Sequence, residues 1–203
     1  MKVIKILLIF ILPFTFTNDN AKAYYFPIEN FREGIIYKYE CLNDPVETQY
    51  WKLTSEFQNL ITEAYNQKYE KFEFFKEKFT DEGSEVVKFI TYANENKSLV
   101  VFNRKIKSSD VFKWSTNEEY GYSAEFIHDS YGDVFFSVSK SFVEKETIKV
   151  LGIDRETLKF KCLYKTKIPS TNYDYSYIQY MYYAQNLGLV KIEKEYPSGK
   201  KLP

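Results

Sequence analysis

The sequence predicts a mainly β protein built as one strongly curved antiparallel sheet, in the form of a half-barrel or an open barrel. Three observations support this fold class. Apolar and polar residues alternate along most of the chain, which is the pattern of strands with one buried face. Turn-forming residues recur about every eight to twelve positions, a spacing typical of antiparallel sheets and barrels. Residues that favour strands are abundant, with 19 tyrosines and 18 phenylalanines among 203 residues.

The first 23 residues have the features of a secretory signal peptide. Two lysines precede an apolar stretch, Ile6–Phe16, that is too short to span a bilayer, and Ala21-Lys22-Ala23 has the small residues of a cleavage site. We therefore expect residues 1–23 to be removed. Residues 24–203 should form a single β-rich domain, because no repeat or change of composition divides them. The mature chain is expected to be exported, to the periplasm or the extracellular space.

The charge of the expected mature chain is nearly balanced. Removing residues 1–23 takes three lysines and Asp19 from 28 basic and 28 acidic residues, which leaves 25 and 27 and a net charge of −2. A nucleic-acid-binding surface needs a basic excess, and so does electrostatic binding to anionic lipids. We therefore expect no nucleic-acid partner and no membrane binding through charge alone.

The first strands are expected to follow an extended lead-in. Pro27 interrupts strand pairing within residues 24–34, and Ile35–Glu40 then alternates between apolar and polar side chains. Asn43-Asp44-Pro45 is a turn signal, and Val46–Leu53 alternates again. We predict that these two segments form a first hairpin.

Ser55–Phe79 allows two interpretations. Its aromatic and aliphatic side chains recur at steps of three and four, which is the spacing of a helical stripe. The same region also contains alternating pieces, Leu60–Tyr65 and Phe72–Phe79, separated by turn-forming residues. We favour two strands with a phase slip between Phe74 and Phe75 at a β-bulge. The alternative is one helix over residues 55–79 that covers the sheet.

The rest of the chain is predicted to form further strands separated by turns. The expected strands are Val86–Tyr92, Leu99–Ile106, Val111–Ser115, Tyr120–His128, Val134–Val143, Thr147–Leu151 and Thr157–Lys167. An alternating run of tyrosines then begins at Asn172, breaks at Asn186-Leu187-Gly188 and continues as a last alternating run that ends near Gly199. This C-terminal stretch predicts a hairpin of two strands.

One face of the predicted tyrosine strand is the candidate ligand-binding surface. Tyr173, Tyr175, Tyr177 and Tyr183 share this face, because side chains two positions apart in a strand point to the same side. Tyrosine supplies apolar area with a polar tip, so such a row on a concave sheet suits a lipid, a glycan or an extended peptide. The alternative is that these rings pack against neighbouring strands or a covering helix.

Cys41 and Cys162 are the two cysteines of the chain. In an exported protein they could form a disulfide, which would stabilise the fold by up to about 4–5 kcal/mol in the chain-entropy model because it closes a long loop. The alternative is two separate thiols that pack as small hydrophobic groups. The sequence leaves both possibilities open.

The sequence contains no recognisable catalytic or metal-binding motif. His128 is the single histidine, and catalytic dyads and most zinc sites need histidine together with partners, so we expect a solvent-facing residue at a strand end. Asp129 and Asp133 lack the spacing of a calcium loop. With 28 acidic residues, pairs of carboxylates arise from composition alone. We therefore expect no enzyme activity, no cofactor and no bound metal.

The C-terminal stretch resembles a group of small exported bacterial proteins of uncharacterised function that end in a YA…GLVK strand pair. In this chain the pattern is Tyr182-Tyr183-Ala184 followed by Gly188-Leu189-Val190-Lys191, and Thr157–Cys162 and Phe31–Tyr39 are similar to other recurrent segments of the group. The group often has a Pro-Gly turn before the last strand, where this chain has Gln185-Asn186. The resemblance implies a strongly curved antiparallel sheet, distantly similar to the half-barrels of periplasmic lipoprotein carriers. It implies no reaction.

These observations support two main hypotheses of function. The first is an exported, non-enzymatic binding module that holds an apolar or amphipathic ligand, such as a lipid, on its aromatic-rich curved sheet. The second is a structural or assembly protein of the cell envelope that acts through contacts with other proteins. A third hypothesis, a hydrolase of envelope polymers, requires two carboxylates that converge in a pocket. The identity of the ligand and the oligomeric state are open at this point.

Overall fold

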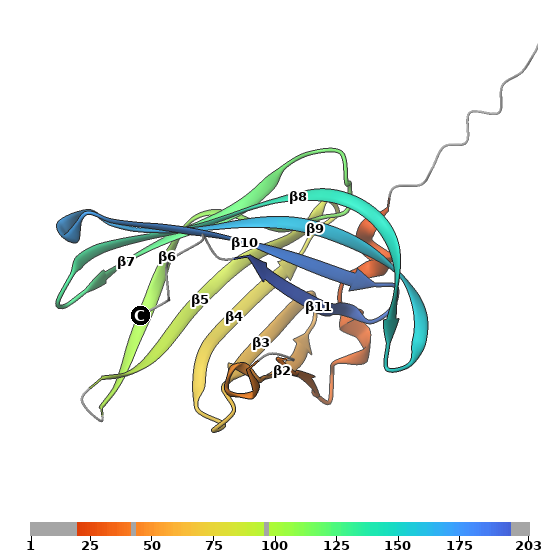
Figure 1. Ribbon diagram of the computed structural model, residues 1–203, viewed down its shortest axis with the longest axis horizontal. Coiled ribbons are helices and arrows are strands. Elements are labelled where there is room, and N and C mark those ends of the chain that lie inside the picture. The colour runs from red at the N-terminus through yellow and green to blue at the C-terminus, as the bar shows by residue number, and fades with distance from the viewer. Residues whose placement is uncertain (1–19, 42–43, 96–97, 196–203) are drawn as a thin grey trace, which may run out of the picture.

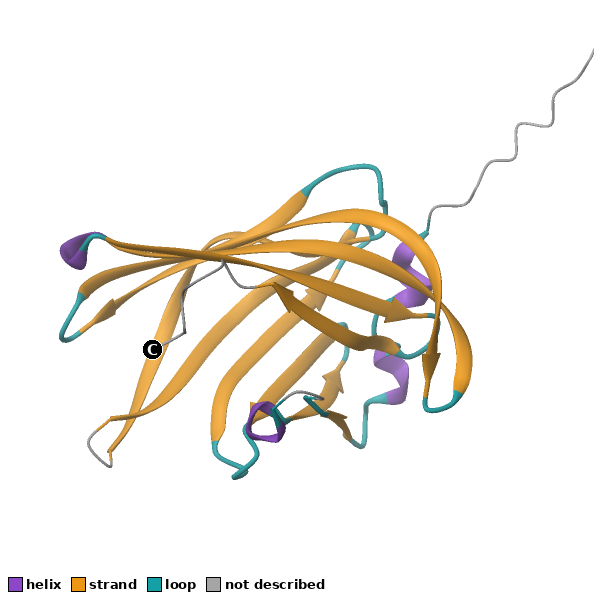
Figure 2. Ribbon diagram, viewed as in Figure 1, coloured by secondary structure: helices purple, strands orange, loops and turns teal. Residues whose placement is uncertain are grey.

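The computed structural model describes residues 20–41, 44–95 and 98–195, which form one antiparallel sheet of eleven strands (Figure 1). The strands pair in chain order, with β1 at one edge and β11 at the other. Figure 2 shows that helical structure is confined to short 3-10 turns at the periphery. The predicted fold class, a mainly β protein with one strongly curved sheet, is therefore confirmed. The strands are β1 (Ile35–Tyr39), β2 (Gln49–Glu56), β3 (Asn59–Tyr65), β4 (Lys71–Phe79), β5 (Gly83–Glu95), β6 (Ser98–Lys113), β7 (Tyr120–His128), β8 (Gly132–Val150), β9 (Ile153–Ile168), β10 (Tyr173–Ala184) and β11 (Gly188–Glu195).

Side chains join the two edges of the sheet, which curls until β1 approaches β11 (Figure 1). The hydroxyl of Tyr37 donates to the carbonyl oxygen of Leu187 at 2.7 Å, and the hydroxyl of Tyr39 donates to the carbonyl oxygen of Leu189 at 2.9 Å. We call this junction the seam. Among the described strands no main-chain ladder links β1 to β11, so the sheet is a nearly closed barrel.

The N-terminal segment fills one end of the barrel. Instead of the expected extended lead-in it forms two 3-10 turns, η1 (Ala21–Tyr24) and η2 (Ile28–Asn30). The main-chain N–H of Ala21 donates to the carbonyl oxygen of Trp114 at 2.8 Å and ties this segment to the sheet. We call residues 20–34 the plug. Its buried side chains are Ala21, Tyr24, Tyr25, Phe26 and Phe31.

The main hydrophobic core lies between the plug and the sheet. Phe112, Phe160 and Tyr183 come from three strands and meet edge to face, with ring centroids 5.0 to 5.7 Å apart. Tyr25 of the plug packs against Phe112 at 4.4 Å and against Tyr183 at 5.6 Å. Edge-to-face contacts of this kind add to the stabilisation that burial of the rings provides. This half of the barrel is therefore filled by the side chains of the protein itself.

The region that allowed two interpretations consists of strands. The predicted strands are confirmed, and residues 55–79 do not form the alternative helix. The predicted phase slip between Phe74 and Phe75 is wrong, because Phe75 and Glu77 are both buried on one face of β4. β4 bulges at Phe72, where Ala64 and Tyr65 of β3 pair with Glu73 and Lys71. A second bulge lies in the partner strand β5. Lys76 and Glu77 pair with Lys88 and Val86, which leaves Val87 as the extra residue.

Two pairs of predicted strands are continuous in the structure. Residues 99–106 and most of 111–115 belong to β6, and residues 134–143 and 147–150 belong to β8. The register of pairing shifts at each junction, between residues 106 and 108 and between residues 142 and 144. A bulge therefore bends each strand where the sequence predicted a turn, and β8 curves over the barrel through its 19 residues (Figure 1).

Some predictions concern residues outside the described ranges. These are most of the predicted signal peptide (residues 1–19), Asn43 of the first predicted turn, and the residues that follow Glu195. Pro45 of that turn begins η3 (Pro45–Glu47). No helix within the described ranges is long and apolar enough to cross a membrane.

We predict that Gly188→Ala destabilises the protein because the plug leaves no room for a side chain there. Gly188 has a φ of +80°, and a Cβ atom would lie 2.3 Å from Cδ1 of Phe26. Gly152→Ala is the matched control, since Gly152 has a φ of +81° and nothing within 4 Å of such a Cβ. The control should lose about 1 kcal/mol from its backbone conformation, and Gly188→Ala about 1–3 kcal/mol more from overpacking. Urea unfolding measures both, and equal losses would contradict the packing of Phe26 beneath this turn.

Candidate functional site

Three of the four predicted ligand-binding tyrosines lie together, and the fourth does not. Tyr173, Tyr175 and Tyr177 lie on the inner face of β10, with successive ring centroids 6.1 Å apart. They occupy the end of the barrel opposite the plug, which we call the open end. Tyr183 is 3% exposed and packs in the main core against Phe112. Tyr175 is also buried, at 7% exposed. The alternative interpretation, in which the rings pack within the protein, therefore describes Tyr183 and Tyr175.

Six rings from six strands, Tyr177 among them, line the inside of the sheet. We call them the aromatic belt. Its members are Phe75 (β4), Phe89 (β5), Tyr122 (β7), Phe136 (β8), Tyr164 (β9) and Tyr177 (β10). The rings of Tyr164 and Tyr177 stack with centroids 4.8 Å apart and planes at 8°. Phe89 contacts Phe136 at 5.9 Å although two strands lie between theirs in the sheet, so curvature brings the belt together.

β6 contributes a cation to the belt instead of a ring. The guanidinium carbon of Arg104 lies 4.8 Å from the ring centroid of Phe89, 4.3 Å from that of Phe126 and 5.4 Å from that of Phe136. These distances are within the range of cation–π attraction. The Nε–H of Arg104 donates to the hydroxyl of Thr91 at 3.3 Å. Burial among the rings lowers the pKa of Arg104 to about 10. Because this value is still well above neutral pH, the side chain remains cationic there.

Glu73 of β4 is an acidic residue that interacts electrostatically with Arg104. It pairs across the ladder with Thr91, whose hydroxyl accepts from Arg104. Burial raises the pKa of Glu73 to about 7, although the positive charge of Arg104 acts in the opposite direction. Both residues are half-buried. Glu73 therefore changes its charge close to neutral pH.

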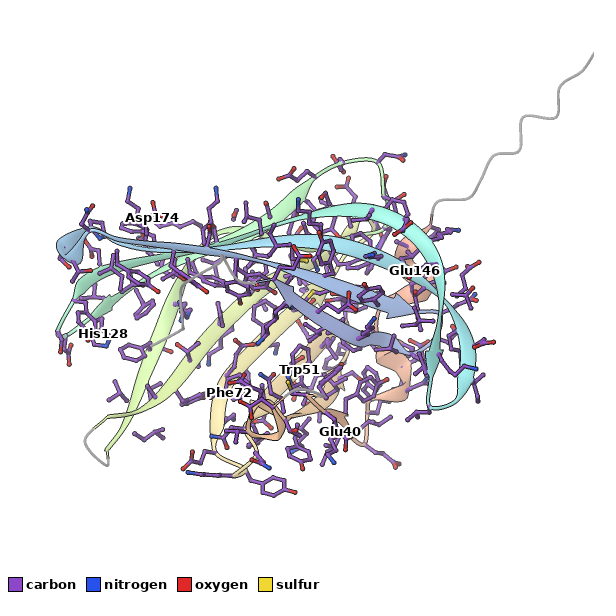
Figure 3. The ribbon with its side chains drawn as sticks, in the orientation of Figure 1. Glu40, Trp51, Phe72, His128, Glu146 and Asp174 are labelled. Carbon is purple, nitrogen blue, oxygen red and sulfur yellow. The ribbon has the colours of Figure 1, made fainter. Side chains whose placement is uncertain are left out.

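His128 lies near the rim of the open end (Figure 3). Its ring stacks on Phe102 at 5.1 Å and contacts Tyr131 at 4.5 Å, and the main-chain N–H of Ser130 donates to its Nδ1 at 3.1 Å. The predicted solvent-facing histidine is therefore half-buried between two rings. In the ranges that the structure describes, no three His, Cys, Asp or Glu side chains are arranged to hold a metal ion.

The plugged half of the barrel encloses a second set of charged groups. The Glu77 carboxylate accepts from the hydroxyl of Tyr25 at 2.6 Å and from that of Ser84 at 2.8 Å. The ammonium group of Lys140 donates to the carbonyl oxygen of Val111 at 3.0 Å. Burial raises the pKa of Glu77 and lowers that of Lys140. Because each residue is only 4% exposed, these groups stabilise the fold and do not meet a solute.

Cys41 and Cys162 are both free thiols in the structure. Cys162 is enclosed in the main core, whereas Cys41 is partly exposed just beyond β1. The candidate disulfide is not formed in the structure, and the alternative of two separate thiols describes it. Burial raises the pKa of the Cys162 thiol, which keeps it protonated and weakly reactive.

Two hollows lie away from the open end. A cavity of about 600 Å³ borders the plug, and the exposed carboxylates of Glu29 and Asp81 line it together with two lysines. Solvated charges of both signs are unlike the shielded acid and base that glycoside hydrolysis requires. A hollow of about 330 Å³ lies on the outer face, where serines of β7 and β8 border it. Both hollows differ from the belt, whose lining is mainly aromatic.

Arg104 and Glu73 were not singled out from the sequence. A signal for both is present, because each lies in phase with apolar residues on the same strand. Arg104 lies two positions from both Phe102 and Ile106, and Glu73 lies two positions from Phe75, so each shares a strand face with them. Because burying an isolated charge is costly in free energy, a charged residue at an inward position indicates a structural partner or a functional role.

We predict that the free energy of unfolding falls as the pH rises from about 4.5 to about 7, in part through Glu73. Its pKa in the folded protein is about 7, above the ~4.3 of unfolded glutamate. The unfolded chain therefore releases this proton first, and stability is lost across that interval. Glu73→Gln should remove about 1–2 kcal/mol of the loss when urea unfolding is compared at both ends of it. Glu119→Gln, at an exposed site, is the control, and an unchanged slope in Glu73→Gln would refute the assignment.

No protein-family model matches the chain, and no curated protein is similar to it in sequence at a significant level. Among solved structures, the fold is similar to the crystal structure of a "putative lipoprotein" from Parabacteroides distasonis. The two have 12% sequence identity and a TM-score of 0.44, over 79% of this chain and 86% of that chain. A likeness at this level carries no argument about function. The comparisons do not support the C-terminal sequence resemblance, whereas the curved sheet that it implied is the fold of this protein.

Proposed function

We propose that the protein is an exported, non-enzymatic binding module that holds an apolar or amphipathic ligand at the open end of its barrel. The observation that carries this proposal is the aromatic belt. Its rings come from six strands and converge on the concave side of the sheet. Tyr122, Phe136, Tyr164 and Tyr177 are only half-buried, so the belt presents ring surface that the protein itself does not cover.

An apolar chain lying on the belt would remove this ring surface from water. Burial of apolar surface contributes about 25 cal/mol per Å², so covering on the order of 200 Å² would favour binding by about 5 kcal/mol before the entropic cost of association. Contiguous apolar surface of this kind on a soluble domain commonly marks a binding site. The plug restricts the site to one end, because the other end is already filled.

A second candidate function, a structural or assembly protein of the cell envelope, is supported by apolar residues at the outside of the barrel. Phe57 is 101% exposed, Leu151 98% and Ile127 74%. Contacts with a partner protein would cover such residues. Single exposed apolar side chains are common on soluble proteins, whereas the belt is continuous, and for this reason we favour ligand binding.

We predict that the exported chain keeps Ala21. Cleavage after Ala23, which the sequence predicts, would remove packed residues: Ala21 is 1% exposed, and the Ala23 carbonyl oxygen accepts from the main-chain N–H of Asn186 at 2.8 Å. Export after cleavage further upstream would preserve these contacts. The intact mass of the protein recovered from the medium or periplasm of an expressing cell measures the position, and a stably folded chain that begins at Tyr24 would contradict the expectation.

We predict that the apolar fluorescent probe N-phenyl-1-naphthylamine binds to the protein, and that Tyr164→Ala combined with Tyr177→Ala weakens its binding about tenfold. These two rings stack on each other in the belt, and their loss removes aromatic contact area worth about 1–2 kcal/mol. Tyr180→Ala is the matched control, because Tyr180 lies on the opposite face of the same strand. Equal affinity in all variants, or a folded protein that leaves the probe unbound, would refute the proposal.

A further inference from the structure

We propose that Arg104 binds the anionic head of an amphipathic ligand whose apolar chain lies on the aromatic belt, and that Glu73 balances the guanidinium when this site is empty. The inference rests on the proposed function, because it assigns a chemical class to the ligand of the belt. That class is a single-chain amphiphile with a carboxylate head.

The hydrogen-bonding capacity of Arg104 is the first argument. A guanidinium has five N–H donors arranged to bind the two oxygens of a carboxylate. Among the described residues, Arg104 makes one hydrogen bond, from Nε to Thr91. The rings of Phe89, Phe126 and Phe136 surround its charge, and ring faces offer no strong acceptor. The two terminal nitrogens are therefore the donors that an incoming carboxylate would use.

The position of Arg104 within the belt is the second argument. Two of the rings that flank it, Phe89 and Phe136, are belt members. From Phe136 the aromatic surface continues to Tyr164 at 6.1 Å and then to Tyr177 at 4.8 Å. A ligand with its head at Arg104 would thus have its chain directed along these rings toward Tyr173 and the open end. Head site and chain surface form one continuous strip.

The relation between Glu73 and Arg104 is the third argument. A permanent ion pair would hold the carboxyl ionised well below neutral pH, but burial keeps the pKa of Glu73 at about 7. Below that pH the protonated side chain leaves Arg104 available to another anion. Above it, the Glu73 carboxylate competes with the ligand and repels it. Carboxylate binding should therefore be tighter at pH 6 than at pH 8.

Other ionisable groups face Arg104 and Glu73, and the experiment must distinguish their titration from that of Glu73. On β7, burial holds the pKa of Tyr122 well above its usual value, so Tyr122 stays neutral in this range. Glu77 lies deeper, bonded to Tyr25 of the plug. His128 lies beyond Phe102, and histidine is the side chain that commonly changes charge between pH 6 and 8. The His128→Gln variant therefore accompanies the measurement.

The experiment compares decanoate with decanol, two probes that share a chain and differ in the charge of the head. Isothermal titration calorimetry is carried out at pH 6 and pH 8 on the folded, full mature chain. Arg104→Gln removes the proposed contact, and Glu73→Gln removes the competitor. Lys105→Gln is the matched charge control, because Lys105 is the neighbouring cation on the outer face, where it pairs with Glu125 at 3.6 Å.

The expected results follow from the charge of each group. The unmodified protein should bind decanoate up to about tenfold more tightly at pH 6 than at pH 8, and Glu73→Gln should abolish that difference while His128→Gln and Lys105→Gln retain it. Arg104→Gln should weaken decanoate binding about tenfold to a hundredfold and change decanol binding less than about twofold.

Three outcomes would overturn the inference in distinguishable ways. Binding of decanol as tight as that of decanoate at both pH values would refute the role of Arg104 and leave the proposed function intact. Absence of binding of either probe, with the protein folded by circular dichroism, would refute both. If Arg104→Gln fails to fold, the pH dependence of Glu73→Gln decides alone, and a difference as large as in the unmodified protein would refute the inference.

Discussion

The joining of β1 to β11 at the seam is the constraint on which the rest of this structure depends. An eleven-stranded meander has two free edges, and here two tyrosine hydroxyls and the plug hold them together. The ring of Phe26 lies directly beneath the turn that begins β11, so the plug supports the seam from inside. With one end filled in this way, the concave face remains uncovered only at the other end, and there the aromatic belt lies.

The interior combines aromatic rings with a few charged groups, and their surroundings differ with depth. Glu77 and Lys140 are enclosed and bonded to fixed partners, as buried charges must be if the fold is to be stable. Arg104 and Glu73 lie nearer the open end and are half-buried, and the hydroxyl that accepts from Arg104 belongs to Thr91, the ladder partner of Glu73. Glu77 and Lys140 therefore help to specify how the core packs. Arg104 retains N–H donors that could bind a ligand, and this difference separates a structural role from a proposed binding role.

Alternation of side chains was sufficient to predict most strands, because one face of nearly every strand is apolar. It predicted β3, β10 and β11, and it placed Tyr173, Tyr175 and Tyr177 on one face of β10. It failed in β4, where a phase slip was expected so that Phe72 and Phe74 could share a face with Phe75. The pairing runs through Phe74 and Phe75 without a shift, so the charged residues Glu73 and Glu77 share the face of Phe75.

Strand ends and the assembly of the belt could not be predicted for different reasons. Within β6 and β8, short polar stretches that resembled turns are bulges of continuous curved strands. Turns and bulges have similar residue composition, so the sequence does not distinguish them. The belt unites rings from β4 to β10, and which of them meet depends on how tightly the sheet curls. That property arises from many weak contacts and has no local sequence signal.

The composition of the two edge strands has a consequence for association between molecules. An uncovered strand edge is a template for another chain and a starting point for aggregation. Here β1 has only five residues, and Lys191, Glu193, Lys194 and Glu195 leave the far half of β11 charged and exposed. A foreign strand that docked on this edge would have to strip water from these charges. The charged edge therefore disfavours intermolecular β-pairing at protein concentrations where an apolar edge strand would promote fibre formation.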